Sequence, residues 1–139
     1  MSKSEYRAVI IGLTGIGARR PQEEERFPVY GTMPGSHAAS YFRCPGTRVV
    51  GVCDLREEAL ANFRADWGDD WPDVNLYRDY QELLEKEKPD LVSVVTSDHA
   101  HADITVAAAE GGTRAILCEK PIATTLEDAD RMIAAAKAN

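Results

Sequence analysis

The sequence lacks any long apolar run, and no stretch approaches the roughly 18 consecutive apolar residues that a membrane-spanning helix needs. The first seven residues are also too polar to supply the apolar segment of a secretory signal peptide. These two absences argue against an integral membrane protein and give no sign of secretion. We therefore expect a cytoplasmic protein that has no membrane partner.

Cysteine is scarce as well. The three cysteines, Cys44, Cys53 and Cys118, form no Cys-x-x-Cys pair and are odd in number, which argues against a disulfide framework. Cys53 and Cys118 lie inside apolar, strand-like runs. We expect reduced thiols packed in the core, as in proteins of a reducing compartment.

Clustered basic residues are missing too, and the formal net charge is −7. Arg19 and Arg20 form the only basic pair, and the acidic run 23–25 follows almost at once. A protein that binds nucleic acid needs a concentrated basic surface to meet the phosphates. Nucleic acid is therefore not an expected partner.

What the chain does contain is ordinary globular composition, with 44% hydrophobic and 28% charged residues, in a length of 139 that fits one domain over residues 1–139. Short β-branched runs alternate with longer amphipathic ones. The predicted strands are residues 8–11, 49–53, 74–77, 91–95 and 115–118. The predicted helices are residues 36–42, 57–67, 80–86, 104–110 and a last one that begins at Thr124 or Thr125. This alternation predicts an α/β fold with a doubly wound parallel sheet, the Rossmann arrangement.

The first predicted strand runs directly into a glycine-rich segment, Gly12-Leu13-Thr14-Gly15-Ile16-Gly17. Closely spaced glycines after a strand are typical of a pyrophosphate site, because backbone N–H groups must approach the phosphates without a Cβ in the way. Thr14 stands where the usual pattern has its middle glycine. Its branched side chain crowds the point of closest approach, although its hydroxyl could donate to a phosphate. A plain structural turn is the alternative.

Asp54, at the end of the second predicted strand, is the expected acid that accepts the ribose hydroxyls of adenosine. It lies further from Gly17 than the usual interval of about 20 residues, and we attribute the excess to an insertion at residues 18–35. The insertion leaves open where the phosphate-facing helix begins. Asp54 favours NAD, whereas Arg56 could meet the 2′-phosphate of NADP. The alternative role for Asp54 is a helix N-terminal cap.

Polar clusters follow the last two predicted strands, where open α/β sheets bind their ligands. Glu119 and Lys120 emerge directly from an apolar strand, and Pro121 restricts the backbone of Lys120. A partly buried lysine can have a lowered pKa and act in proton transfer, and a surface lysine in a turn is the alternative. After the fourth strand, His99 and His101 have no clear third ligand, so we expect no metal site.

Four segments resemble the glucose-fructose oxidoreductase, inositol dehydrogenase and rhizopine-catabolism family in order and spacing. They are IIGLTGIG at 10–17, VVGVCD at 49–54, VVTSDHAHADITVAAAEGG at 94–112 and LCEKPIATTLEDADRMI at 117–133. The Glu-Lys-Pro segment is the most specific of them. The resemblance implies the N-terminal NAD(P)-binding domain of an oxidoreductase that transfers a hydride between nicotinamide and the hydroxyl of a sugar or polyol. A small carbohydrate-like substrate and a homo-oligomeric full-length protein are implied with it.

The resemblance also assigns roles to individual residues. Lys120 would be catalytic, bonding the reacting hydroxyl and relaying its proton, with Glu119 nearby. The family usually shows Thr-Pro-Asn where this chain has Thr96-Ser97-Asp98, so those contacts depart from its pattern. The residues implied in cofactor binding are Gly12, Thr14, Gly15, Ile16, Gly17, Asp54, Arg56, Thr96, Asp98, His101, Glu119 and Lys120.

Members of that family continue with a further strand and a larger substrate-binding domain, so we expect this chain to be part of a longer enzyme. By itself it should bind the cofactor and turn over little or no substrate. A non-catalytic module that binds or senses dinucleotide is the alternative. A methyltransferase shares the glycine loop but gives no reason for the Glu-Lys-Pro segment at 119–121.

Overall fold

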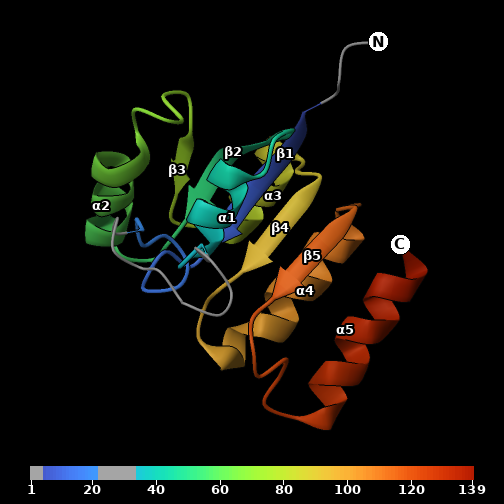
Figure 1. Ribbon diagram of the computed structural model, residues 1–139. Coiled ribbons are helices and arrows are strands. Elements are labelled where there is room, and N and C mark those ends of the chain that lie inside the picture. The colour runs from blue at the N-terminus through green and yellow to red at the C-terminus, as the bar shows by residue number, and fades with distance from the viewer. Residues whose placement is uncertain (1–4, 22–33) are drawn as a thin grey trace, which may run out of the picture.

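The computed structural model describes residues 5–21 and 34–139. The described residues form a five-stranded sheet of parallel strands in the order β3-β2-β1-β4-β5 (Figure 1). The strands are β1 (Tyr6–Ile11), β2 (Thr47–Cys53), β3 (Asn75–Tyr77), β4 (Leu91–Val94) and β5 (Ala115–Cys118). The helices are α1 (His37–Arg43), α2 (Glu57–Trp67), α3 (Tyr80–Glu87), α4 (His101–Glu110) and α5 (Leu126–Ala138), with a 3-10 turn η1 (Asp98–Ala100) before α4.

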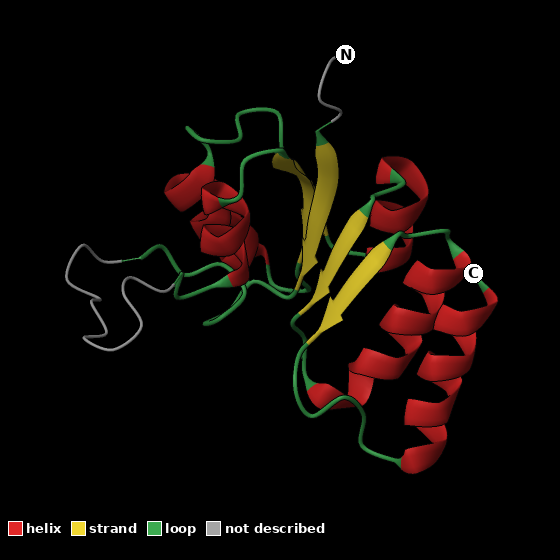
Figure 2. Cartoon of the chain, turned by 45° about the vertical axis from the view of Figure 1, so that its right-hand side comes forward, coloured by secondary structure: helices red, strands yellow, loops and turns green. Residues whose placement is uncertain are grey.

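Helices cover both faces of the sheet, as the alternating pattern predicted. Side chains of α1 and α2 pack on one face around Ile10 and Val52. Side chains of α3 and α4 pack on the other face around Val9 and Ile11. Figure 2 shows the helices in layers on either side of the strands, with α5 lying outside α4. Since neighbouring residues of β1 point to opposite faces, a nearly continuous apolar strand serves both layers, which confirms the doubly wound fold.

Strand order reverses at β1, which pairs with β2 on one side and β4 on the other. In open parallel sheets a crevice forms at such a point, beyond the carboxyl ends of the strands. The segments that follow β1, β2 and β4 all lie at this end of the sheet because the strands are parallel. The fold therefore brings the glycine loop, Asp54 and the polar residues after β4 to one edge.

Element boundaries differ from the predictions mainly where capping decides them. Thr125, and not Thr124, caps α5, and its side chain accepts a hydrogen bond from the backbone N–H of Asp128. Ser36 caps α1 as predicted, through the N–H of Ala39. α4 begins at His101, three residues before the predicted start, because η1 leads directly into it.

Most of the predicted insertion at 18–35 lies outside the described residues, including the acidic run 23–25. In the part of the chain that the structure covers, no helix is long and apolar enough to cross a membrane.

Candidate functional site at the carboxyl ends of the strands

Two glycines allow the loop after β1 to pack closely on its surroundings. Gly12 has a φ of +97°, and a Cβ there would lie 2.4 Å from the carbonyl oxygen of Val95. A Cβ on Gly17 would lie 2.2 Å from the carbonyl oxygen of Gly12. Neither distance is possible for a side-chain carbon beside a rigid backbone oxygen. Both glycines are therefore required by the path of the loop itself.

The tip of the loop is built differently. Gly15 has a φ of +54°, and a Cβ there would meet no atom within 4 Å. Thr14, Gly15 and Ile16 are exposed, and no group in residues 5–21 or 34–139 accepts a hydrogen bond from their three N–H groups. Successive unpaired N–H groups form a concave donor set suited to an anion.

The turn at residues 14–18 is the first turn of the helix that faces the site. The N–H of His37 donates to the carbonyl of Ile16 at 2.8 Å, and the N–H of Ala38 donates to that of Gly17 at 3.1 Å. α1 thus continues the turn, although the insertion separates the two in sequence. The phosphate-facing helix therefore begins at the glycine loop. Its helical path is interrupted after one turn and resumes at His37.

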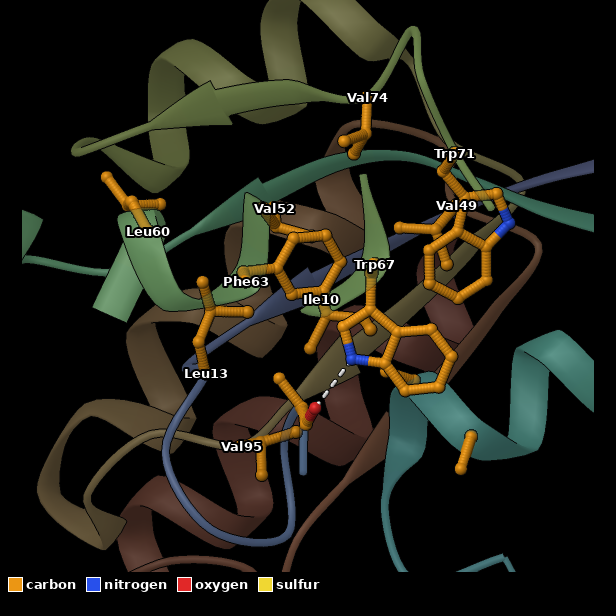
Figure 3. Close-up of a cluster of buried hydrophobic side chains, with 13 residues drawn as sticks. Ile10, Leu13, Val49, Val52, Leu60, Phe63, Trp67, Trp71, Val74 and Val95 are labelled. Atoms are coloured by element: carbon orange, nitrogen blue, oxygen red, sulfur yellow. Dashed lines mark hydrogen bonds between the residues drawn. The ribbon is translucent and has the colours of Figure 1, made fainter. Parts of the chain in front are cut away.

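A buried tryptophan fixes the point where the chain leaves that first turn. The indole N–H of Trp67 donates to the carbonyl of Ala18 at 2.7 Å, drawn as a dashed line in Figure 3. The guanidinium of Arg20 lies 4.4 Å from the centroid of the same ring and forms an ion pair with Asp70. Trp71 stacks on Trp67 with ring centroids 5.0 Å apart. The loop is therefore anchored to the end of α2.

Asp54 braces the glycine loop from β2. One carboxylate oxygen accepts the N–H of Leu13 at 3.0 Å, and the other accepts the N–H of Arg56 at 3.0 Å. The Nε of Arg56 lies 3.4 Å from that second oxygen. Arg56 itself is the N-cap of α2 and has no capping side-chain bond. The cap alternative for Asp54 is therefore wrong. The oxygen bonded to Leu13 keeps a lone pair for a further donor, whereas the other oxygen accepts both the N–H and, at 3.4 Å, the Nε of Arg56.

A hollow of about 280 Å³ lies between the glycine loop and α2. The hollow carries both signs of charge, because two arginines, Arg19 and Arg56, and two carboxylates, Glu58 and Asp66, line it. Thr14 and Gly15 line the same space. Two arginines and two carboxylates balance in charge, so the hollow offers no net positive charge to a second phosphate.

The residues after β4 divide into an exposed set and a buried one. Thr96 is half-buried, and Asp98 and His99 are exposed. His101 is only 1% exposed, with Nδ1 2.9 Å from the carbonyl oxygen of Pro121 and Nε2 3.1 Å from that of Thr96. Since both ring nitrogens are engaged by backbone, His101 joins two loops and does not present a free nitrogen to the crevice. The prediction that it lines the nicotinamide side needs this correction.

Glu119 and Lys120 face different surroundings. The Oε1 of Glu119 lies 3.0 Å from Nε2 of His37, and its Oε2 accepts the backbone N–H of Lys120 at 3.2 Å. The hydrogen bond from His37, followed by that from the Lys120 N–H, lowers the pKa of the Glu119 carboxyl. The Lys120 side chain is exposed, so it is the lysine of a turn and not a partly buried amine.

Of the cysteines, Cys53 is fully buried at the end of β2. Burial, with smaller contributions from the charges of Asp54 and Asp79, raises the pKa of its thiol to about 12. A thiol with so high a pKa is not a nucleophile at neutral pH, because the thiolate is the reactive form. Cys53 is therefore a core residue, as its strand position predicted.

From residue 6 to residue 139 the chain matches the family model described as the oxidoreductase family GFO_IDH_MocA, NAD-binding Rossmann fold. The chain belongs to this family.

Similar proteins agree with that assignment. Inositol 2-dehydrogenase of Salmonella paratyphi B is 34% identical over 98 residues, which are 68% of this chain and 27% of the relative. D-apiose dehydrogenase of Paraburkholderia graminis is 34% identical over 100 residues, 72% of this chain and 25% of the relative. The crystal structure of an oxidoreductase domain protein from Kribbella flavida superposes with a TM-score of 0.73 at 28% identity, covering 97% of this chain and 32% of that one. The chain spans about a quarter of the length of these curated relatives.

For this member of the Gfo/Idh/MocA family, sequence reasoning missed one site residue, His37. The signal that could have found it is Ser93, a hydroxyl in the middle of the apolar run 91–95. A buried polar side chain in a strand requires a partner, and the partners here come from α1.

Proposed function

We propose that this chain binds NAD at the carboxyl ends of β1, β2 and β4 and is the cofactor domain of a dehydrogenase. The observation that carries the proposal is a row of three exposed N–H groups at Thr14, Gly15 and Ile16, which find no acceptor among residues 5–21 and 34–139, with Asp54 bonded to the same loop. The row suits the pyrophosphate, and the carboxylate at the neighbouring strand end suits the adenosine ribose. The residues present therefore fit the cofactor.

Each part of the loop has a task in this proposal. Gly15 leaves room for phosphate oxygens at the loop tip, while Gly12 and Gly17 set the path of the backbone. The hydroxyl of Thr14, on the wall of the hollow, supplies a further donor. Asp54 accepts one ribose hydroxyl with the lone pair that Leu13 leaves open, and the other in place of the long 3.4 Å bond from Nε of Arg56.

The charges around the hollow favour NAD over NADP. Arg56 is the cation placed to meet a 2′-phosphate, but Asp54 already pairs with it. Glu58 and Asp66 border the same space. A 2′-phosphate would bring its charge toward these two carboxylates and the carboxylate of Asp54, and like charges repel at short range.

On the nicotinamide side we assign contacts to Thr96 and Asp98 and the catalytic role to Lys120. When bound, NAD supplies the carbon that accepts the hydride. The Lys120 side chain hydrogen-bonds the reacting hydroxyl and helps relay its proton as the carbonyl forms. Glu119 is the neighbouring carboxylate, and His101 holds the loops that carry Thr96 and Pro121 at a fixed spacing.

The substrate we propose is a sugar or polyol hydroxyl. Relatives of this chain are named inositol 2-dehydrogenase, D-apiose dehydrogenase and D-glucoside 3-dehydrogenase, which all act on such compounds. We further propose that the substrate site and the contacts of a homo-oligomer belong to a longer protein, of which this chain is one domain. Its free cysteines support a reducing, cytoplasmic location.

Calorimetric titration of the chain with NAD and with NADP tests the proposal. We expect NAD to bind more tightly, and saturation at 100 times its Kd to stabilise the fold by about 2.7 kcal/mol. Gly15→Ala should weaken NAD binding at least tenfold, because its Cβ occupies phosphate space. Gly112→Ala, which also has a positive φ and open surroundings, is the control for backbone strain and should leave NAD affinity unchanged. Tighter NADP binding, or no thermal shift with NAD, contradicts the proposal.

Trp67→Phe tests whether the anchor on Ala18 serves the site. The substitution keeps an aromatic ring and removes the N–H donor, leaving a buried carbonyl without its partner. We expect about 1–2 kcal/mol less stability and NAD affinity lower by several-fold. Trp71→Phe makes the same change in a stacked ring whose indole N–H bonds no group in the described residues, and NAD affinity should stay within twofold. Equal effects on NAD affinity in the two variants would show that the hydrogen bond from Trp67 to Ala18 contributes to stability and not to NAD binding.

A further inference from the structure

A chain of polar groups crosses the core beside the proposed catalytic loop. The Nδ1 of His37 lies 3.0 Å from the hydroxyl of Ser93, which lies 2.9 Å from the hydroxyl of Tyr41. The Nε2 of His37 lies 3.0 Å from the carboxylate of Glu119. His37 and Ser93 are buried, so each contact replaces water that these groups had in the unfolded chain.

The chemistry of the ends fixes the direction of the hydrogen bonds. An ionised carboxylate can only accept hydrogen bonds, so Nε2 of His37 carries a proton and donates a hydrogen bond to Glu119. Nδ1 then accepts from the Ser93 hydroxyl, and the Ser93 oxygen accepts from the Tyr41 hydroxyl. Each hydroxyl or ring N–H of this network donates one hydrogen bond, and every buried polar atom of the His37 and Ser93 side chains has a partner. The network therefore holds the imidazole, and through it the carboxylate, in one orientation.

The consequence concerns the residue after Glu119. One oxygen of Glu119 is bonded to His37 and the other to the backbone N–H of Lys120. Within residues 5–21 and 34–139, no carboxylate forms an ion pair with the Lys120 ammonium. The acid adjacent in sequence is a competitor for the Lys120 amine, and its two oxygens are bonded instead to His37 of α1 and to the backbone N–H of Lys120.

We propose that His37 is a positioning residue, which holds Glu119 away from the Lys120 ammonium and so keeps that amine free to reach the substrate hydroxyl. The inference rests on the proposed function, because a free amine at Lys120 serves catalysis only if this site binds NAD. Without His37, the Glu119 carboxylate loses its donor and can pair with the ammonium beside it.

Competitive labelling of the chain with acetic anhydride, followed by mass spectrometry, measures how available the Lys120 amine is. The exposed Lys137 on α5 is the internal reference. We expect His37→Leu to slow labelling of Lys120 relative to Lys137 by about two- to fivefold, because a paired ammonium loses its proton less readily. His37→Gln, whose amide N–H can still donate to Glu119, should label as the unaltered chain does.

A second background separates positioning from packing. When Glu119→Gln is already present, no carboxylate at position 119 remains to pair with Lys120. Adding His37→Leu should then change the labelling ratio by less than about 1.5-fold, because uncoupled substitutions have roughly additive effects. An equal change in both backgrounds, or none in the single variant, overturns the proposal. If His37→Leu does not fold by circular dichroism, the ¹⁵N spectrum of the unaltered chain decides. A proton on Nε2 of His37 and none on Nδ1 supports the network, and an unprotonated Nε2 refutes it.

These measurements need no dinucleotide, so their outcome is separate from that of the NAD titration. A chain that fails to bind NAD loses the proposed function, whatever the labelling shows. A chain that binds NAD but labels equally in all variants keeps the function and loses the role of His37.

Discussion

Gly12→Ala is expected to remove about 2–5 kcal/mol of stability, a large share of the roughly 5–15 kcal/mol that a domain has. Two costs add up. A φ of +97° disfavours any residue with a Cβ by about 1–2 kcal/mol. The new carbon would also lie 2.4 Å from the Val95 carbonyl oxygen, and relief of such a contact in a packed core costs about 1–3 kcal/mol.

The backbone at Gly12 has little freedom to relieve that contact. Its N–H donates to the carbonyl of Cys53 at 2.8 Å on β2, while Val95, the residue after β4, closes the opposite side. Movement away from Val95 is blocked by β2, and movement away from β2 breaks the bond to Cys53. We therefore expect the melting temperature to fall by about 10–20 °C, measured by thermal unfolding.

Gly46→Ala is the matched control for Gly12→Ala. Gly46 has a φ of +90°, but a Cβ there would meet no atom within 4 Å. Gly46→Ala shares the conformational cost of the positive φ and lacks the steric one, so a loss of about 1–2 kcal/mol and a fall in melting temperature of about 4–8 °C are expected. Equal losses in the two variants would show that the contact with Val95 does not dictate glycine at position 12.

The fold could be predicted from the sequence because its determinants are local. A parallel sheet covered on both faces needs runs such as residues 49–53, and helices need caps such as Ser36 and Thr125. Right-handed crossovers between successive parallel strands then leave few arrangements. The strand order and the meeting of the glycine loop with Asp54 follow from these rules.

The site was less predictable wherever a role depends on distant contacts. Glu119 and His37 are 82 positions apart, and no local pattern says which polar residue of α1 faces Ser93. His101 was expected to line the cofactor site, but its ring is used by two backbone carbonyls that only the tertiary fold brings together. Lys120 is exposed because its neighbour Glu119, and not Lys120, turns toward the core.

Asp54→Ala is expected to weaken NAD binding about 100-fold. The proposal gives the Asp54 carboxylate two hydrogen bonds from ribose hydroxyls, and bonds to a charged acceptor contribute about 1.5 kcal/mol each at the lower end of their range. The same variant should lose about 1–3 kcal/mol of stability, because the N–H groups of Leu13 and Arg56 lose their acceptor. Calorimetry and urea unfolding measure the two losses separately.

Asp79→Ala is the control that keeps these two losses distinct. The Asp79 side chain accepts the N–H of Gln81 at 2.7 Å, the same two-residue reach that Asp54 makes to Arg56, and it does so as the N-cap of α3 after β3. Its loss should cost about 1 kcal/mol of stability and leave NAD affinity unchanged. Asp54→Asn, which keeps an acceptor oxygen without the charge, should fall between the unaltered chain and Asp54→Ala in NAD affinity. If Asp54→Ala binds NAD within threefold of the unaltered chain, Asp54 only braces the glycine loop, and the ribose must be held by other groups.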